Sequence, residues 1–126
     1  MEPYEEWLLK AKNDLLSARK LFESGLNDTA IYHTQQCAEK SLKGYCAFKI
    51  QPVQNIHDLV LLNDNCKKLD SDFKKLNAAA IFLNNLDTSF RYPGDELEPS
   101  DKELTSAIEY AEYIFNFVNG KTHYNV

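Results

Sequence analysis

Apolar residues recur along this chain at intervals of three and four positions, and only four glycines and four prolines interrupt the 126 residues. This is the period of amphipathic helices, whereas half-buried strands alternate apolar and polar residues. The first such segment covers residues 4–23, and Gly25 supplies a stop just after it. Its apolar side carries Trp7, Leu8, Ala11, Leu15, Ala18 and Phe22. The pattern therefore predicts a long first helix with one face for a core.

A second and a third helix are predicted on either side of a loop that contains a proline. Asn27 or Asp28 can cap the second helix, which runs to about Lys49 and is broken by Pro52. Its apolar side carries Ala30, Ile31, Cys37, Ala38, Leu42, Tyr45 and Phe48. Residues 50–56 form the loop, and residues 55–58 lead into a short helix. That helix bears Leu59, Leu62 and Cys66.

Two more helices complete the predicted fold. Ser71 or Asp72 can cap a fourth helix, which ends near residues 87–90 because two prolines and a glycine follow in residues 91–99. Ser100 and Glu103 form a capping-box pattern that opens a last helix, and Gly120 closes it. We predict a single all-α domain over residues 1–126, with its core at about 4–119 and a flexible tail over 120–126. Four long helices with short connections imply an up-and-down antiparallel four-helix bundle with an additional short helix.

Composition and charge narrow the class of protein. The net charge of −5 and the pI near 5.1 argue against a binder of duplex DNA or of anionic membranes. No apolar run approaches the ~20 residues that span a bilayer. Three cysteines without CxxC spacing fit reduced thiols that pack as small apolar residues, so we expect a soluble cytoplasmic protein. The acidic residues in 95–103 fit a solvated loop and a helix start better than a metal site.

The second helix also carries a polar stripe. His33, Gln36, Lys40 and Lys43 fall within an arc of roughly 80° on the side opposite the apolar residues. In one interpretation this is a solvated face on which Glu39 and Lys43 form an i,i+4 ion pair. In the other interpretation, the side chains of the stripe bind a polar ligand. The helix alone does not decide between them.

Two short motifs outside this helix add candidate chemistry. His57 with Asp58 can be a simple helix entry, or the imidazole can bind phosphate or transfer protons near neutral pH. Arg91 lies between a helix end and Pro93, where its planar fork suits phosphate. Alternatively, Arg91 complements the negative end of the helix dipole while Tyr92 packs on the bundle.

Taken together, four motifs resemble one known family. They are Trp7, Ala11, Asp14 and Leu15 at the start, then QQCAEKSLK at 35–43, His57-Asp58-Leu59, and Arg91-Tyr92-Pro93. In this order and spacing they resemble the HEPN domain family over nearly the whole chain, from residue 7 to about 118. The resemblance implies a bundle of four or five helices that usually dimerises and has a polar groove for nucleotide or RNA.

The resemblance also divides the expected functions. One branch of the family consists of metal-independent ribonucleases, often toxins, in which an arginine is followed after four to six residues by a histidine. Residues 96–98 of this chain are Glu, Leu and Glu instead. The chain is more similar to a branch that carries Arg-x-Pro and often accompanies a minimal nucleotidyltransferase.

We therefore expect a homodimeric binding module for a nucleotide or RNA, with no catalytic residue, metal or cofactor of its own. Lys40, Lys43 and Arg91 are its predicted phosphate ligands. Gln36 is assigned to hydrogen bonding, Tyr92 to base stacking and His57 to ligand orientation. One alternative is a divergent ribonuclease that uses Arg91 with His57 or His33. Another is a purely protein-binding scaffold or antitoxin-type partner of a nucleotidyltransferase.

Overall fold

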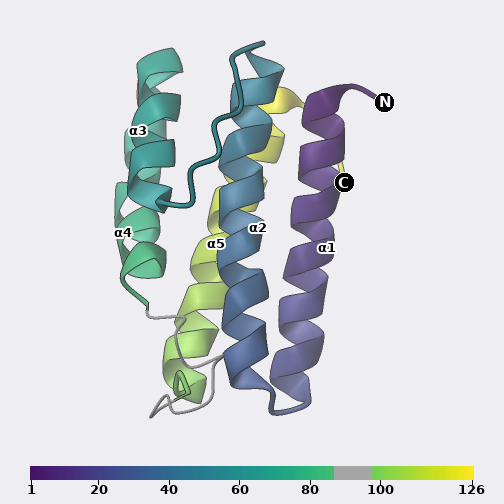
Figure 1. Cartoon of the computed structure of the whole chain (residues 1–126), viewed down its shortest axis with the longest axis vertical. Helices are drawn as coiled ribbons and strands as arrows, with labels where there is room; N and C mark the ends of the chain where they lie inside the picture. Colours follow the sequence, from purple (N-terminus) through teal and green to yellow (C-terminus); the bar gives the residue numbers. More distant parts are fainter. Residues whose placement is uncertain (87–97) are drawn as a thin grey trace.

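The computed structural model describes residues 1–86 and 98–126 as a bundle of helices. Three long helices, α1 (Pro3–Glu23), α2 (Asn27–Phe48) and α5 (Asp101–Thr122), lie side by side (Figure 1). The shorter α3 (Leu59–Leu69), η1 (Ser71–Leu76) and α4 (Asn77–Asn85) pack along α2 and α5. Both chain ends lie at the same end of the bundle. The predicted all-α bundle is confirmed.

The predicted apolar faces meet in one core, to which every helix contributes. On α1, Leu8, Ala11, Leu15 and Ala18 are buried, as the three-and-four spacing predicts. The close contact between α1 and α2 depends on Gly44, where an added Cβ would lie 3.1 Å from Cδ2 of Leu8. A larger residue at position 44 would force the Leu8 side chain to shift.

Several predicted helix boundaries are confirmed. Gly25 ends α1 with a φ of +75°, the left-handed conformation that glycine adopts without strain. Asp58 caps α3, because its Oδ1 accepts from the backbone N–H groups of Val60 at 2.9 Å and Leu61 at 3.1 Å. The Ser100–Glu103 capping box opens α5.

Other boundaries differ from the predictions. Asn27 lies inside α2, and its side chain donates to the carbonyl of Pro99 and to Asp101, so it joins the start of α2 to the start of α5. The fourth helix begins as the 3₁₀ turn η1, which Asp70 caps, and not Ser71 or Asp72. As a consequence, α4 is a short helix.

At the other end of the chain, α5 continues two residues beyond Gly120, and its last turn is held to η1. Lys121 Nζ lies 2.8 Å from Asp70 Oδ2 and 2.7 Å from Asp72 Oδ2. Hydrogen bonds donated by Lys121 lower the pKa of the carboxyl groups of Asp70 and Asp72. The helix end that we predicted to fray is therefore paired with the 3₁₀ turn.

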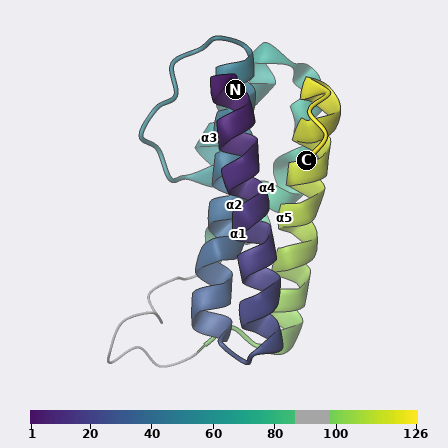
Figure 2. The same cartoon turned by 90° about the vertical axis from the view of Figure 1, so that its right-hand side faces the viewer.

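The segment between α2 and α3 determines where the functional side chains meet. Residues 49–58 run back alongside α2, so that α3 rises parallel to α2 (Figures 1 and 2). The His57 side chain consequently lies beside Glu39. Glu39 is about 14 Å along the helix axis from the C-terminal end of α2. A tight turn in place of this segment would leave His57 near the end of the bundle.

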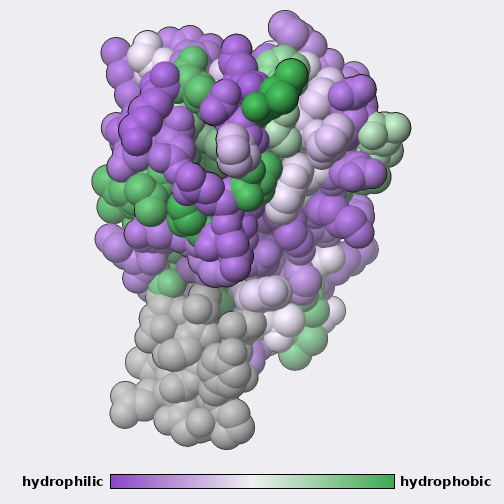
Figure 3. Space-filling view, turned by 45° about the horizontal axis from the view of Figure 1, so that its top comes forward, coloured by the Kyte–Doolittle hydropathy of each residue, from purple (hydrophilic) through white to green (hydrophobic). Residues whose placement is uncertain are grey.

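The surface at the α3 end is mostly hydrophilic, with small apolar patches separated by polar side chains (Figure 3). None of the described helices is both long and apolar enough to span a membrane.

Candidate functional site

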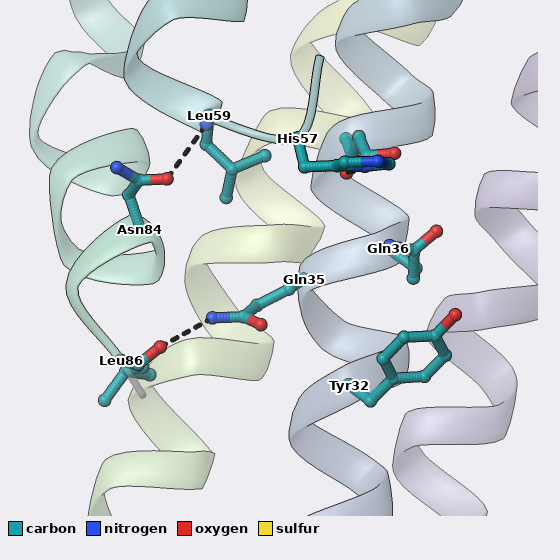
Figure 4. A pocket seen from close by; sticks show the side chains of 8 residues that line it. Tyr32, Gln35, Gln36, His57, Leu59, Asn84 and Leu86 are labelled. Carbon is teal, nitrogen blue, oxygen red and sulfur yellow. Dashed lines mark hydrogen bonds and ion pairs between the residues drawn. The ribbon is translucent and has the colours of Figure 1, made fainter. Parts of the chain in front are cut away.

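A pocket with a volume of about 390 Å³ opens between α2, the start of α3 and the end of α4 (Figure 4). Its described lining consists of Tyr32, Gln35, Gln36, Glu39, His57, Leu59, Asn84 and Leu86. Such a volume lies within the range of roughly 300–1,000 Å³ that is usual for small-molecule sites. Most of the lining side chains carry hydrogen-bonding groups. The pocket therefore has a mostly polar lining.

Two amide side chains fix the walls of this pocket by satisfying helix ends. Gln35 Nε2 donates to the carbonyl oxygens of Leu83 at 2.7 Å and Leu86 at 3.0 Å, which lie at the end of α4. Asn84 Oδ1 accepts from the backbone N–H of Leu59, 2.9 Å away, at the start of α3. Terminal groups of a helix lack partners within the helix, so these bonds tie the three elements together. They also fix which end of each amide faces the pocket.

The imidazole of His57 is oriented by a buried ion pair. His57 Nδ1 lies 3.0 Å from Glu39 Oε1, and Lys43 Nζ lies 3.1 Å from Glu39 Oε2. The side chains of Glu39 and Lys43 are each only 7% exposed, whereas that of His57 is 72% exposed. Lys43 also lies against the ring of Trp7, with 5.8 Å from Nζ to the ring centroid. The ion pair therefore belongs to the helix packing, and the imidazole is its accessible end.

A second cluster of the same composition joins α2 to α1. Asp14 accepts from Lys40 Nζ at 2.7 Å and lies 2.8 Å from His33 Nδ1. The Asp14 side chain is 10% exposed, so most of its hydrogen-bonding capacity is used inside the bundle. This cluster does not line the pocket.

The structure thus divides the predicted ligand-binding residues into two groups. Gln36 and His57 line one pocket, while Lys40 and Lys43 face the carboxylates of Asp14 and Glu39. The i,i+4 pair of Glu39 and Lys43 exists, but it is buried and not solvated. Arg91 and Tyr92 lie outside the described residues.

Four polar lining residues were not predicted as ligand-binding residues: Tyr32, Gln35, Glu39 and Asn84. Tyr32, Gln36 and Glu39 follow each other at four and three positions, which places them on one helix face and could have revealed that side of the pocket. No sequence pattern indicated Asn84, because its role depends on a hydrogen bond from the backbone N–H of Leu59, which is far away in the sequence.

The three cysteines pack as small apolar residues, as predicted. Cys37, Cys46 and Cys66 are all buried free thiols. Burial raises the pKa of Cys37 to about 12, so this thiol is unreactive at neutral pH. Across residues 1–86 and 98–126, no group of three or more His, Cys, Asp or Glu side chains is placed to hold a metal ion.

Comparison with solved structures agrees with this architecture. The chain is similar to TT1696 from Thermus thermophilus, with a TM-score of 0.80 and 26% identity over 96% of this chain and 99% of that one. It is also similar to ST0689, an archaeal HEPN homologue, with a TM-score of 0.74 and 27% identity over 97% and 99% of the two chains. A comparison with curated proteins finds no match. These similarities define the class as a HEPN-type helical bundle.

The sequence profile of the HEPN domain matches residues 4–121. The chain belongs to the HEPN domain family, as the four motifs indicated.

Proposed function

We propose that this HEPN domain binds a nucleotide or an RNA segment in the pocket between α2, α3 and α4. The observation that carries the proposal is the pocket itself, whose walls are fixed by the backbone bonds of Gln35 and Asn84. A site whose polar groups are already held in place loses little conformational entropy on binding. Gln36 and His57, two of the predicted ligand-binding residues, contribute side chains to this pocket.

In this proposal the two predicted lysine ligands support the site without neutralising phosphate. Lys40 and Lys43 each face a carboxylate at 2.7 Å and 3.1 Å, so little of their positive charge is available to a ligand. Arg91 is then the main predicted phosphate ligand, and Tyr92 the predicted stacking group. They follow Leu86, which lines the pocket, by five and six residues in the sequence.

The first experiment is calorimetric titration of the full chain with ATP, GTP and a short RNA. The RNA is recovered afterwards and run on a denaturing gel. We expect saturable binding and intact RNA. Arg91→Ala and His57→Ala should weaken binding, whereas His123→Ala, at the exposed end of α5, is the matched control. Equal affinities for all four proteins would refute this site.

Partners form a second part of the proposal. We propose a homodimer, supported by an apolar surface on α4 and α5 where Ile81 and Tyr113 are 49% and 48% exposed. The rings of Phe82 and Tyr110 pack 4.9 Å apart in the same region. Light scattering should give twice the monomer mass, and Ile81→Lys should reduce it. The association with a minimal nucleotidyltransferase remains a prediction from the Arg-Tyr-Pro motif, to be tested by co-purification.

One observation favours a ribonuclease as the second candidate. A buried carboxylate that orients a solvent-facing imidazole is the arrangement used by general acid–base catalysts. Glu39 and His57 have this arrangement at 3.0 Å. Cleavage of the RNA in the titration, abolished by His57→Asn and by Arg91→Ala, would establish this function in place of simple binding.

A further inference from the structure

The charges around the pocket indicate which part of a nucleotide it can accept. In the described portion of its lining there is no lysine or arginine, and Glu39 is the carboxylate that faces it. The ammonium group that pairs with Glu39 belongs to Lys43, which is 7% exposed and does not line this pocket. Because Lys43 offsets the charge of Glu39, the described lining offers a phosphate no net positive charge to bind. An uncharged heterocycle does not need one.

The two amides that hold the walls differ in what they leave to a ligand. Gln35 uses its N–H groups on two backbone carbonyls, which leaves its Oε1 as an acceptor. Asn84 uses its Oδ1 on the N–H of Leu59, and its Nδ2 points away from α2 (Figure 4), so Asn84 holds the wall and does not read the ligand. The half-buried Gln36 makes no hydrogen bond within the described part of the chain. It therefore presents both a donor and an acceptor.

The rings near Gln36 suit a planar ligand. Along α2, the imidazole of His57 and the phenol ring of Tyr32 lie on either side of Gln36 (Figure 4). Aromatic side chains bind bases by stacking, and an amide side chain forms a bidentate pair with the amino group and ring nitrogen of adenine. Guanine is usually read by arginine or lysine, which the described lining lacks.

Resting on the proposed function, we infer that this pocket recognises an adenine base. The base can be supplied by a free adenine nucleotide or by single-stranded RNA. Gln36 reads its donor–acceptor edge, while Gln35 supplies a further acceptor from the fixed wall. The phosphates lie outside the pocket.

The test uses calorimetry of the full chain with adenosine, guanosine, ATP and sodium tripolyphosphate as separate probes. We expect adenosine to bind and to compete with ATP, tripolyphosphate not to compete, and guanosine to bind at least about tenfold more weakly. Oligoadenylate is compared with oligouridylate of equal length. Tighter binding of oligoadenylate than of ATP identifies RNA as the source of the base, and the reverse identifies the mononucleotide.

Two variants connect this selectivity to named side chains. Gln36→Leu should weaken adenosine binding about tenfold, while Gln51→Leu, an exposed glutamine in the 49–58 segment, should not change it. Circular dichroism verifies the fold of each variant.

The possible failures can be told apart. If ATP binds and tripolyphosphate competes while adenosine does not, nucleotide binding stands and the adenine inference is overturned. Equal affinities for adenosine and guanosine would also overturn it. If ATP, both oligonucleotides and adenosine all fail to bind, the proposed function fails and the inference fails with it.

Discussion

Removing the ammonium group of Lys43 should destabilise the domain strongly, although lysines are usually dispensable for stability. Lys43 and Glu39 face each other at 3.1 Å, with both side chains 7% exposed. At an effective dielectric constant of about 20, two unit charges at this distance attract each other by about 5 kcal/mol. The desolvation of both groups already offsets much of this attraction in the native protein. The variant Lys43→Met would leave Glu39 buried without its cation.

We expect Lys43→Met to lower the free energy of unfolding by about 3 kcal/mol, the lower end of the range for a broken buried pair. The lower end applies because His57 Nδ1, 3.0 Å from Glu39 Oε1, still gives the carboxylate one hydrogen-bonding partner when Lys43 is removed. For a domain of this size the melting temperature should fall by about 10 °C. Urea unfolding followed by circular dichroism gives the free energy without relying on Trp7, which contacts Lys43.

Two further proteins complete the experiment. The double variant Glu39→Met/Lys43→Met should recover most of the loss, because apolar side chains replace both buried charges. Lys20→Met is the matched control, since Lys20 pairs with Glu23 at 3.8 Å with both side chains mostly exposed, and should cost less than about 0.5 kcal/mol. If Lys43→Met costs no more than Lys20→Met, the buried pair is not formed in solution. Lys43 would then be free for the phosphate role that the sequence suggested.

The remaining predictions concern the helix ends and the core. Hydrogen bonds from Lys121 lower the pKa values of Asp70 and Asp72 below the ordinary 3.8. These ion pairs therefore stabilise the folded protein fully above pH 3.8, and the stabilisation is lost as the pH falls through the lowered pKa values. Lys121→Met should therefore destabilise the domain at pH 7, and its difference from the native protein in urea unfolding should disappear near pH 2. Ser100→Ala removes the cap of α5 and should cost about 1 kcal/mol in the same assay. Cys37, with its pKa raised to about 12 by burial, should react with a thiol reagent only in denaturant.

The long helices could be predicted because their apolar periodicity and some of their boundary signals are local. The capping box at Ser100 and the glycine at position 25 mark helix boundaries through the local backbone conformation, which does not depend on the neighbouring helices. The 3₁₀ turn η1 carries no comparable signal. Phe73 and Leu76 are three positions apart, a spacing that an α-helix and a 3₁₀ helix bury equally well.

The site was less predictable because helix periodicity shows which side of a helix is polar or apolar, but not which residues of other elements lie opposite that side. The arc that contains Lys40 and Lys43 looks like one polar surface when α2 is considered alone. That Lys40 faces Asp14 depends on how α2 is rotated against α1. The 49–58 segment, whose path no local rule determines, then brings His57 to Glu39. Long-range packing therefore decides which polar residues remain available to a ligand.

The two clusters on α2 show how the fold distinguishes a packing role from a ligand-binding one. Each consists of a carboxylate with one lysine and one histidine, at distances between 2.7 Å and 3.1 Å. They differ in the exposure of the imidazole, which is 29% for His33 and 72% for His57. An imidazole shielded by neighbouring side chains can do little more than hold two helices together, whereas an exposed one can meet a ligand while its other nitrogen stays bonded. The cluster of His57 lines the pocket between α2, α3 and α4 in the described part of the chain, and this difference supports the proposed ligand binding on the α3 side of α2 and helix packing on the α1 side.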